Sequence, residues 1–283
     1  MTAVTANSPA RPRVARARPP LFRASRVNGL LAHGYIWFIL VLFVLPFFAL
    51  LGFSLTGPGP SPGIDNYTYV LNTFGDNLLW SLKVSALTLL LNALISLPAG
   101  YAIVRKSFPG KRLLFSLLTL PLYVPGAVIG ISLVLTYNFT YHLTTSMWGL
   151  VFAMTVGTFP LMLTPIVVAM KDLPIVFEEA GACLGASSWQ TYRKIVFPLI
   201  GPGISAGLLL SFIIVFNEYL VTLFVPPPGL TTAPLRVFNQ IRTAGLAPTT
   251  AALAVTMQVV SFLAVILFFR IFGTRHLKGT YIL

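Results

Sequence analysis

Residues 78–104 read LLWSLKVSALTLLLNALISLPAGYAIV, and Lys83 is the only charged side chain among them. A helix that crosses the hydrocarbon core of a bilayer needs roughly 20 mostly apolar residues, because the core is about 30 Å thick and each residue rises about 1.5 Å. The stretch therefore predicts a membrane-spanning helix, and the fold follows from how many such stretches the chain holds.

Further stretches of this kind are Tyr35–Leu55, Leu113–Tyr137, Trp148–Met170, Gly203–Val225 and Ala251–Phe272. All six are predicted to be helices, since an open strand edge cannot satisfy its backbone polar groups in lipid. Prolines at positions 98, 121, 125, 160 and 165 could act as bends for movement or as static kinks. We expect an all-α polytopic membrane protein with six transmembrane helices.

The composition supports this class. Hydrophobic residues make up 56% of the 283 residues and charged residues 9%, whereas a soluble domain carries about 25% charged residues. This balance excludes an ordinary soluble enzyme and a disordered chain. Cys183 is the only cysteine, which excludes an intrachain disulfide.

The net charge of +13 comes from 19 Lys and Arg against 6 Asp and Glu. Most of the basic residues precede the first stretch, follow the sixth, or lie between the second and third and between the fourth and fifth. The positive-inside rule then places both termini in the cytoplasm of a multi-pass membrane protein, in contact with lipid and not with nucleic acid. We expect residues 1–32 to be a disordered basic cytoplasmic tail, with a transit peptide as the alternative, and residues 33–283 to be the transmembrane domain.

Reactive groups are scarce. The phosphate-binding pattern G-x-x-x-x-G-K-[ST] is absent, and the three histidines are too dispersed for paired metal ligation. We therefore expect a non-catalytic chain that binds no cofactor or metal itself. Gly203 and Gly207 fit a nucleophile-elbow pattern around Ser205, but inside a membrane helix they are better explained as small-xxx-small packing, like Gly126 and Gly130.

The loop of residues 171–200, on the predicted cytoplasmic side, is expected to fold as two short helices. Gly185 can adopt the left-handed conformation that ends the first helix. Ser187 and Gln190 have capping-box spacing for the second helix, which is expected to stop before Pro198. Such a folded loop indicates a docking element, and a plain polar connector is the alternative.

This loop resembles the EAA loop of binding-protein-dependent ABC importer permeases, whose pattern is E-A-A-x3-G-x9-I-x-L-P. Residues in register with the pattern are Glu179, Ala180, Gly185, Ile195 and Pro198. Gly181 stands in place of the second Ala of the pattern, and Phe197 in place of its Leu. Segments 120–132, 211–218 and 234–239 are similar to spermidine/putrescine-type permeases.

The resemblance implies the type I ABC importer permease fold and a set of partners. In that family two permease subunits line the path, two ATPase subunits hold ATP and Mg, and an extracytoplasmic binding protein delivers the solute. The polyamine likeness implies a heterodimer with a second homologous permease. The residues that the resemblance assigns to ATPase coupling are Glu178, Glu179, Ala180, Gly181, Gly185 and Trp189.

The solute implied by the likeness is a polyamine or a related organic cation. Relatives import other small solutes of the amino acid, opine, iron or thiamine class, so these stay open. A stand-alone secondary transporter is the alternative from another class, although it would leave the EAA loop without a purpose.

Glu218 lies within the fifth stretch, and a carboxylate in a membrane costs at least about 2.5 kcal/mol, so it usually faces a cavity or a partner. Together with Asn217 and Tyr219 it could bind an amine cation on the path. Lys83 is its possible ion-pair partner, which leaves a path role and a structural pair both open. Further along, Arg236 and Arg242 are expected on a short outer helix that contacts the binding protein or simply packs on the surface.

Overall fold

The computed structural model describes residues 26–57, 63–140, 146–227, 229 and 231–270, and these form helices and connecting loops without a strand. The all-α prediction is thus confirmed for the described residues. The chain divides into two units, residues 1–49 and 50–283, each described by itself. Of the predicted tail, residues 1–25 lie outside the described residues, and helix α1 already begins within the remainder, at Arg26.

Four helices are long and apolar enough to cross a membrane, and two bent helix pairs reach that length together, which gives four to six spans in the described ranges. The four are His33–Ser54 within α1 (Arg26–Ser54), α2 (Asp65–Arg105), α5 (Met147–Asp172) and α12 (Pro248–Phe268). The last ends four residues before the predicted limit of the sixth stretch.

The third predicted stretch is broken rather than continuous. Helices α3 (Lys111–Thr119) and η1 (Leu120–Tyr123) run into α4 (Gly126–Thr140) through a bend of 109°. Val124 has extended backbone at the bend, and Pro125 after it has no N–H to continue a helical ladder. By contrast, prolines 98, 160 and 165 lie inside continuous helices.

The fifth stretch is broken as well. Helix α9 (Gly201–Asn217) ends where Glu218 adopts extended backbone, and α10 (Leu220–Phe224) follows. At its other end α9 meets the loop helices at 66°. The short helices of the loop are α6 (Val176–Cys183), α7 (Ser188–Thr191), the π-helical turn η3 (Tyr192–Val196) and α8 (Phe197–Leu199).

Glycines let the helices of the second unit approach closely. A Cβ on Gly203 would lie 2.5 Å from Ala169 Cβ of α5, and one on Gly207 would lie 2.8 Å from Met162 Sδ. On α4, a Cβ on Gly130 would lie 2.9 Å from Phe224 Cδ2 of α10. The predicted small-xxx-small packing is confirmed at these glycines.

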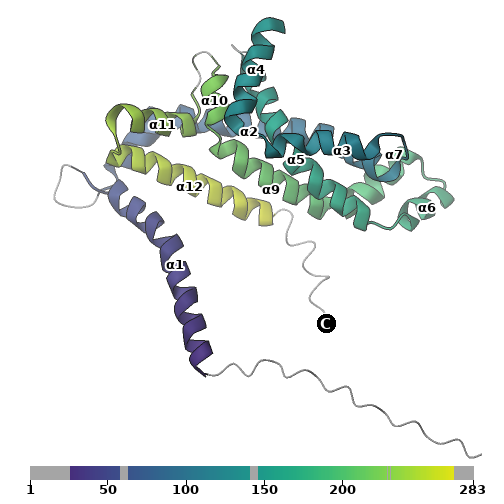
Figure 1. Cartoon of the computed structure of the whole chain (residues 1–283), viewed down its shortest axis with the longest axis horizontal. Helices are drawn as coiled ribbons and strands as arrows, with labels where there is room; N and C mark the ends of the chain where they lie inside the picture. The colour runs from purple at the N-terminus through teal and green to yellow at the C-terminus, as the bar shows by residue number, and fades with distance from the viewer. Residues whose placement is uncertain (1–25, 58–62, 141–145, 228, 230, 271–283) are drawn as a thin grey trace, which may run out of the picture. The chain divides into compact units, whose positions relative to one another are not determined.

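Helices α2, α5 and α9 pack against one another (Figure 1). A polar seam runs down the buried face of α2, formed by Ser81, Ser85, Thr88, Asn92 and Ser96. Asn92 Nδ2 donates to Thr158 Oγ1 of α5 at 2.8 Å. Hydrogen bonds of this kind hold membrane helices together, because apolar side chains gain little from leaving lipid.

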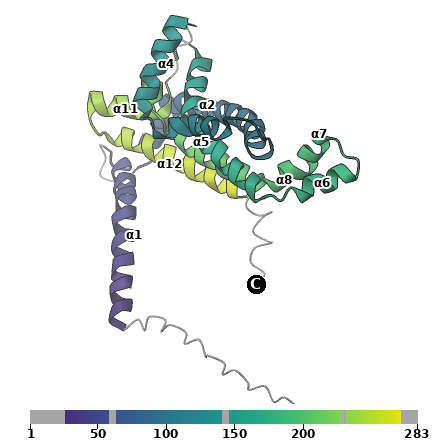
Figure 2. The same cartoon turned by 45° about the vertical axis from the view of Figure 1, so that its right-hand side comes forward.

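The loop helices lie at one end of the second unit, and α4 and α11 (Ala233–Ala244) lie at the other (Figure 2). Helix α2 reaches both ends. In its N-terminal half, Asn77 Nδ2 donates to Thr231 O at 2.6 Å and Ser81 Oγ accepts from Ala233 N at 2.8 Å. At its other end, Arg105 lies beside the loop.

Candidate functional site

The first loop helix, α6, ends as the sequence predicts. Gly185 has φ +80°, in the left-handed region. Ala186 N donates to Gly181 O and Gly185 N to Ala182 O, both at 3.0 Å. This pair of bonds is the Schellman motif, which satisfies the last carbonyls of a helix and reverses the chain.

The second loop helix begins with the predicted capping box. Gln190 N donates to Ser187 Oγ at 3.3 Å, and Ser187 N donates to Gln190 Oε1 at 2.9 Å. The predicted stop before Pro198 is wrong, because α8 contains this residue. Pro198 is tolerated because it sits in the first turn of α8, where its missing N–H removes no helical bond.

Gly181 is buried where the two loop helices meet. A Cβ there would lie 2.9 Å from Ile195 Cδ1 and 3.2 Å from Thr191 Oγ1. The glycine thus allows the second helix to lie close against α6.

The two adjacent glutamates of α6 have different surroundings. Glu178 is half-buried, and its Oε1 accepts from Arg105 Nε at 2.5 Å. Its Oε2 accepts from Tyr101 Oη at 3.1 Å, while Arg105 Nη2 donates to Leu173 O at 2.8 Å. Glu179 is exposed. Glu178 therefore binds α2 within this chain, and Glu179 is the one presented outward.

Aromatic rings continue this contact into the second loop helix. Tyr192 packs edge-on against Tyr101, with centroids 5.5 Å apart, and stacks on Trp189 at 6.0 Å. Trp189 is 66% exposed, so it leaves an apolar face available on the loop surface. Ala180 and Gly185 are exposed too.

Sequence reasoning missed Arg105 and Tyr101 as members of this site. From the sequence, Arg105 has an explanation only as a positive charge near the end of a span. Their four-residue spacing puts both side chains on one face of α2, which is the signal that could have found them.

The Glu218 side chain binds backbone amides at the break between α9 and α10. Its Oε1 accepts from Leu220 N at 2.6 Å and from Val221 N at 3.2 Å. A carboxylate at this place is stabilised by the free amides and the dipole of the helix start. Its Oε2 faces Gly126, in a cavity of about 210 Å³ that Thr158 also lines.

The ion pair between Lys83 and Glu218, one of the two alternatives for Glu218, is not formed within the described residues. The Lys83 ammonium lies over the Trp80 ring, 4.4 Å from its centroid, on the exposed side of α2. Glu218 obtains its hydrogen bonds from backbone amides instead, so neither group needs the other.

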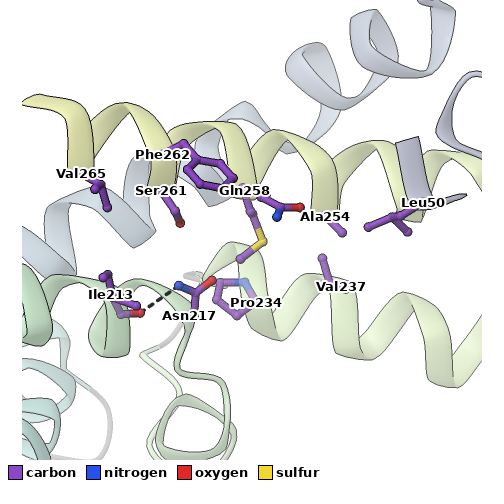
Figure 3. A pocket seen from close by; sticks show the side chains of 11 residues that line it. Leu50, Ile213, Asn217, Pro234, Val237, Ala254, Gln258, Ser261, Phe262 and Val265 are labelled. Atoms are coloured by element: carbon purple, nitrogen blue, oxygen red, sulfur yellow. Dashed lines mark hydrogen bonds between the residues drawn. The ribbon is translucent and has the colours of Figure 1, made fainter. Parts of the chain in front are cut away.

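Asn217 and Tyr219 do not converge with Glu218 on one cavity. Tyr219 stacks on Phe238 of α11, with centroids 4.9 Å apart. Figure 3 shows Asn217 donating to Ile213 O, at 2.8 Å, beside a second cavity of about 530 Å³.

This second cavity lies between α9, α11 and α12, and most of its lining is apolar. Polar side chains enter it from Asn217, Gln258 and Ser261 (Figure 3). Ser261 Oγ is buried and has no hydrogen-bond partner within the described part of the chain. Such a lining, apolar with a few convergent polar groups, is typical of a small-molecule site.

The two arginines of α11 also differ. Arg236 is half-buried, with its guanidinium 4.7 Å from the centroid of the Phe74 ring of α2. Arg242 is exposed, 5.8 Å from the Phe238 ring. Only Arg242 is thus well placed to meet a partner. Across the described ranges, no group of three or more His, Cys, Asp or Glu is arranged to hold a metal ion.

Residues 92–275 match the family described as the binding-protein-dependent transport system inner membrane component. This match covers more than half of the chain, so the chain belongs to that family. It is a non-catalytic permease subunit of a binding-protein-dependent ABC importer, a class in which the ATPase is a separate subunit.

Two curated relatives come from Escherichia coli (strain K12). The molybdenum transport system permease protein ModB is 35% identical over 183 residues, which cover 59% of this chain and 80% of the relative. The spermidine/putrescine transport system permease protein PotC is 28% identical over 204 residues, 71% of this chain and 76% of the relative. Both are permeases, but the solutes in their names differ.

Two solved structures share the fold. A bacterial ABC transporter involved in the import of the acidic polysaccharide alginate has a chain with TM-score 0.71 and 14% identity, over 88% of this chain and 95% of that one. The MetNI methionine ABC transporter, in inward-facing conformations, has a chain with TM-score 0.61 and 16% identity, over 70% of this chain and 93% of that one. The fold is therefore that of ABC importer permeases.

Proposed function

We propose that this chain is a six-span subunit of the bacterial inner membrane that forms half of the translocation path for a small solute. The family match over residues 92–275 carries the proposal. Six spans result if each bent pair counts as one, and an even number puts both termini on one side. The basic loops favour the cytoplasm for that side. In this proposal residues 1–32 form a cytoplasmic tail and residues 33–283 the transmembrane domain.

The proposed assembly has a second homologous permease, as a heterodimer, with two ATPase subunits that hold ATP and Mg and an extracytoplasmic binding protein. A bacterial alginate ABC transporter of similar fold, solved in complex with a periplasmic protein, supports the last of these partners. The exposed Glu179, Ala180, Gly185 and Trp189 would contact the ATPase, and Arg242 would contact the binding protein. The chain itself would bind no cofactor.

The mechanism follows from the position of the loop. Closure of the ATPase pair around ATP would displace α6. A rigid-body movement of the packed helices would then switch the translocation path between its outward-facing and inward-facing states. Helices α2, α5 and α9 pack through glycines and a polar seam, so they would move as one body.

The proposed solute is a polyamine or a related organic cation. PotC supports this class, and so does Glu218 Oε2 facing a cavity, since a carboxylate can bind an ammonium group. The second candidate is a small oxyanion, because ModB is more similar in sequence over its aligned part. The neutral polar lining by Asn217, Gln258 and Ser261 suits hydrogen bonds to either class.

The test is reconstitution of the chain with its second permease, ATPase and binding protein in proteoliposomes. ATP-dependent uptake is measured for spermidine, putrescine, molybdate and sulfate. Uptake of an amine alone supports the first candidate, and uptake of an oxyanion alone supports the second. A complex that hydrolyses ATP on addition of the binding protein but imports none of the four would contradict both candidates.

A further inference from the structure

The two neighbouring glutamates of the loop of residues 171–200, hereafter the coupling loop, differ in their surroundings and therefore in the role they can have. Glu179 is exposed, whereas the side chain of Glu178 is only 13% exposed and is held by the end of α2. A half-buried carboxylate that already accepts from two side chains is poorly available to an outside partner. The contact of Glu178 therefore joins two parts of this subunit.

The contact at Glu178 joins three elements. Arg105 bonds the carboxylate of α6 through Nε and the Leu173 carbonyl, just before α6, through Nη2. Because a guanidinium is planar and always charged, two bonds of this kind fix both distance and orientation. Tyr101 adds a bond to the same carboxylate and packs against Tyr192 of the second loop helix.

In its N-terminal half, α2 contacts the start of α11. Asn77 and Ser81 bond the backbone of Thr231 and Ala233, and Phe74 lies under the Arg236 guanidinium. One continuous helix of 41 residues thus connects the loop with α11. The contacts of Arg105 and Asn77 lie 105 − 77 = 28 residues apart on this helix, or about 40 Å, so the helix can carry a displacement from the loop to α11.

We propose that Arg105 and Tyr101 are positioning residues that latch the coupling loop to α2. In this arrangement Glu179 meets the ATPase, and Glu178 passes the movement of the loop to α2 and hence to the α11 end. The inference rests on the proposed function, and it changes the role of Glu178 from ATPase contact to internal latch.

The experiment uses the full complex with variants Arg105→Gln and Glu178→Gln, the swapped pair Arg105→Glu with Glu178→Arg, and Lys106→Gln as control. Lys106 is the exposed neighbour of Arg105 and also basic. Uptake and ATP hydrolysis are measured together, and the ATPase subunit that co-purifies is quantified.

Each single variant is expected to retain the ATPase subunit while solute imported per ATP falls about tenfold, within the usual range of coupling between sites. The swapped pair should restore most of that ratio, and Lys106→Gln should leave it unchanged. Loss of the ATPase subunit in Arg105→Gln, or an unchanged ratio, would overturn the latch.

A second measurement separates the latch from the proposed function. Hydrogen exchange of residues 176–183 in the purified complex should rise in Arg105→Gln and Glu178→Gln and not in Lys106→Gln. This readout needs no transported solute. Faster exchange together with no uptake by the unaltered complex would support the latch and contradict the proposed function, whereas unchanged exchange would contradict the latch.

Discussion

Glu178 in the coupling loop and Glu218 at the break in the fifth stretch are both held by hydrogen bonds, but over very different sequence separations. Glu178 binds Arg105, 73 residues away, whereas Glu218 binds amides two and three residues ahead of it. A long-range contact fixes the relative position of two elements, and a local one fixes a bend in a single segment. We infer that the first carboxylate serves movement between elements and the second serves the shape of one element.

The largest effect is expected at the long-range contact. Glu178→Ala would leave the half-buried Arg105 guanidinium without its carboxylate, which destabilises the loop by about 3 kcal/mol. The matched change Glu179→Ala, on an exposed neighbour, should cost less than about 0.5 kcal/mol. Hydrogen exchange of α6 measures both, and equal effects would contradict the difference between the two glutamates.

The next effect concerns the close approach of the two loop helices. Gly181→Val adds atoms where Ile195 Cδ1 leaves only 2.9 Å to a Cβ, and such overpacking costs roughly 1–3 kcal/mol. Ala182→Val on the exposed side of the same helix is the control, since it changes helix propensity but meets no neighbour there. Thermal unfolding in detergent compares the two, and a midpoint lowered equally in both would show that the contact is unimportant.

At the local contact, Glu218→Ala should cost about 1 kcal/mol through loss of the two hydrogen bonds from the first amides of α10. Glu218→Gln retains an acceptor oxygen and should be more stable than the alanine variant, yet it removes the charge that an ammonium group would need. Amine uptake by Glu218→Gln is therefore the deciding measurement. Normal uptake at normal protein level would exclude a path role for the carboxylate.

The smallest effect is expected at Lys83. Lys83→Met should cost about 0.5–1 kcal/mol, the range for an exposed cation over an aromatic ring. Combined with Glu218→Gln, the two costs should add within about 0.5 kcal/mol, because the groups do not touch. A coupling energy well above about 0.5 kcal/mol would show that Lys83 and Glu218 interact, against the structure.

Local signals in the sequence predicted local structure well. The αL position at Gly185, the capping box of Ser187 and Gln190, and the close packing of Gly203 all depend on neighbours or on steric size. They could be predicted because each signal carries its own physical reason. The helix class followed from apolar length alone.

What could not be predicted depends on contacts between distant residues. The sequence around Arg105 and the sequence around Glu178 give no sign of the bond between them. A positive charge at the end of a span is already explained by the orientation of the protein in the membrane. The break at residue 218 was also missed, since apolar length says nothing of backbone continuity, whereas the bend at Val124 falls beside Pro125, one of the prolines named as possible bends or kinks. The alternative that paired Glu218 with Lys83 is not found among the described contacts, because backbone amides at a helix start satisfy this carboxylate without any side chain.

The π-helical turn of residues 192–196 sets the direction in which the loop residues after it face. A π turn holds more residues than an α turn, so it delays the rotation of everything after it. If the same residues formed ordinary α-helix instead, the residues after them would turn by as much as about 100° about the helix axis, whereas deletion of one residue would remove the π turn and leave their facing nearly unchanged. The π turn thus sets which face α8 presents, while α9 begins beyond a separate bend of 66°.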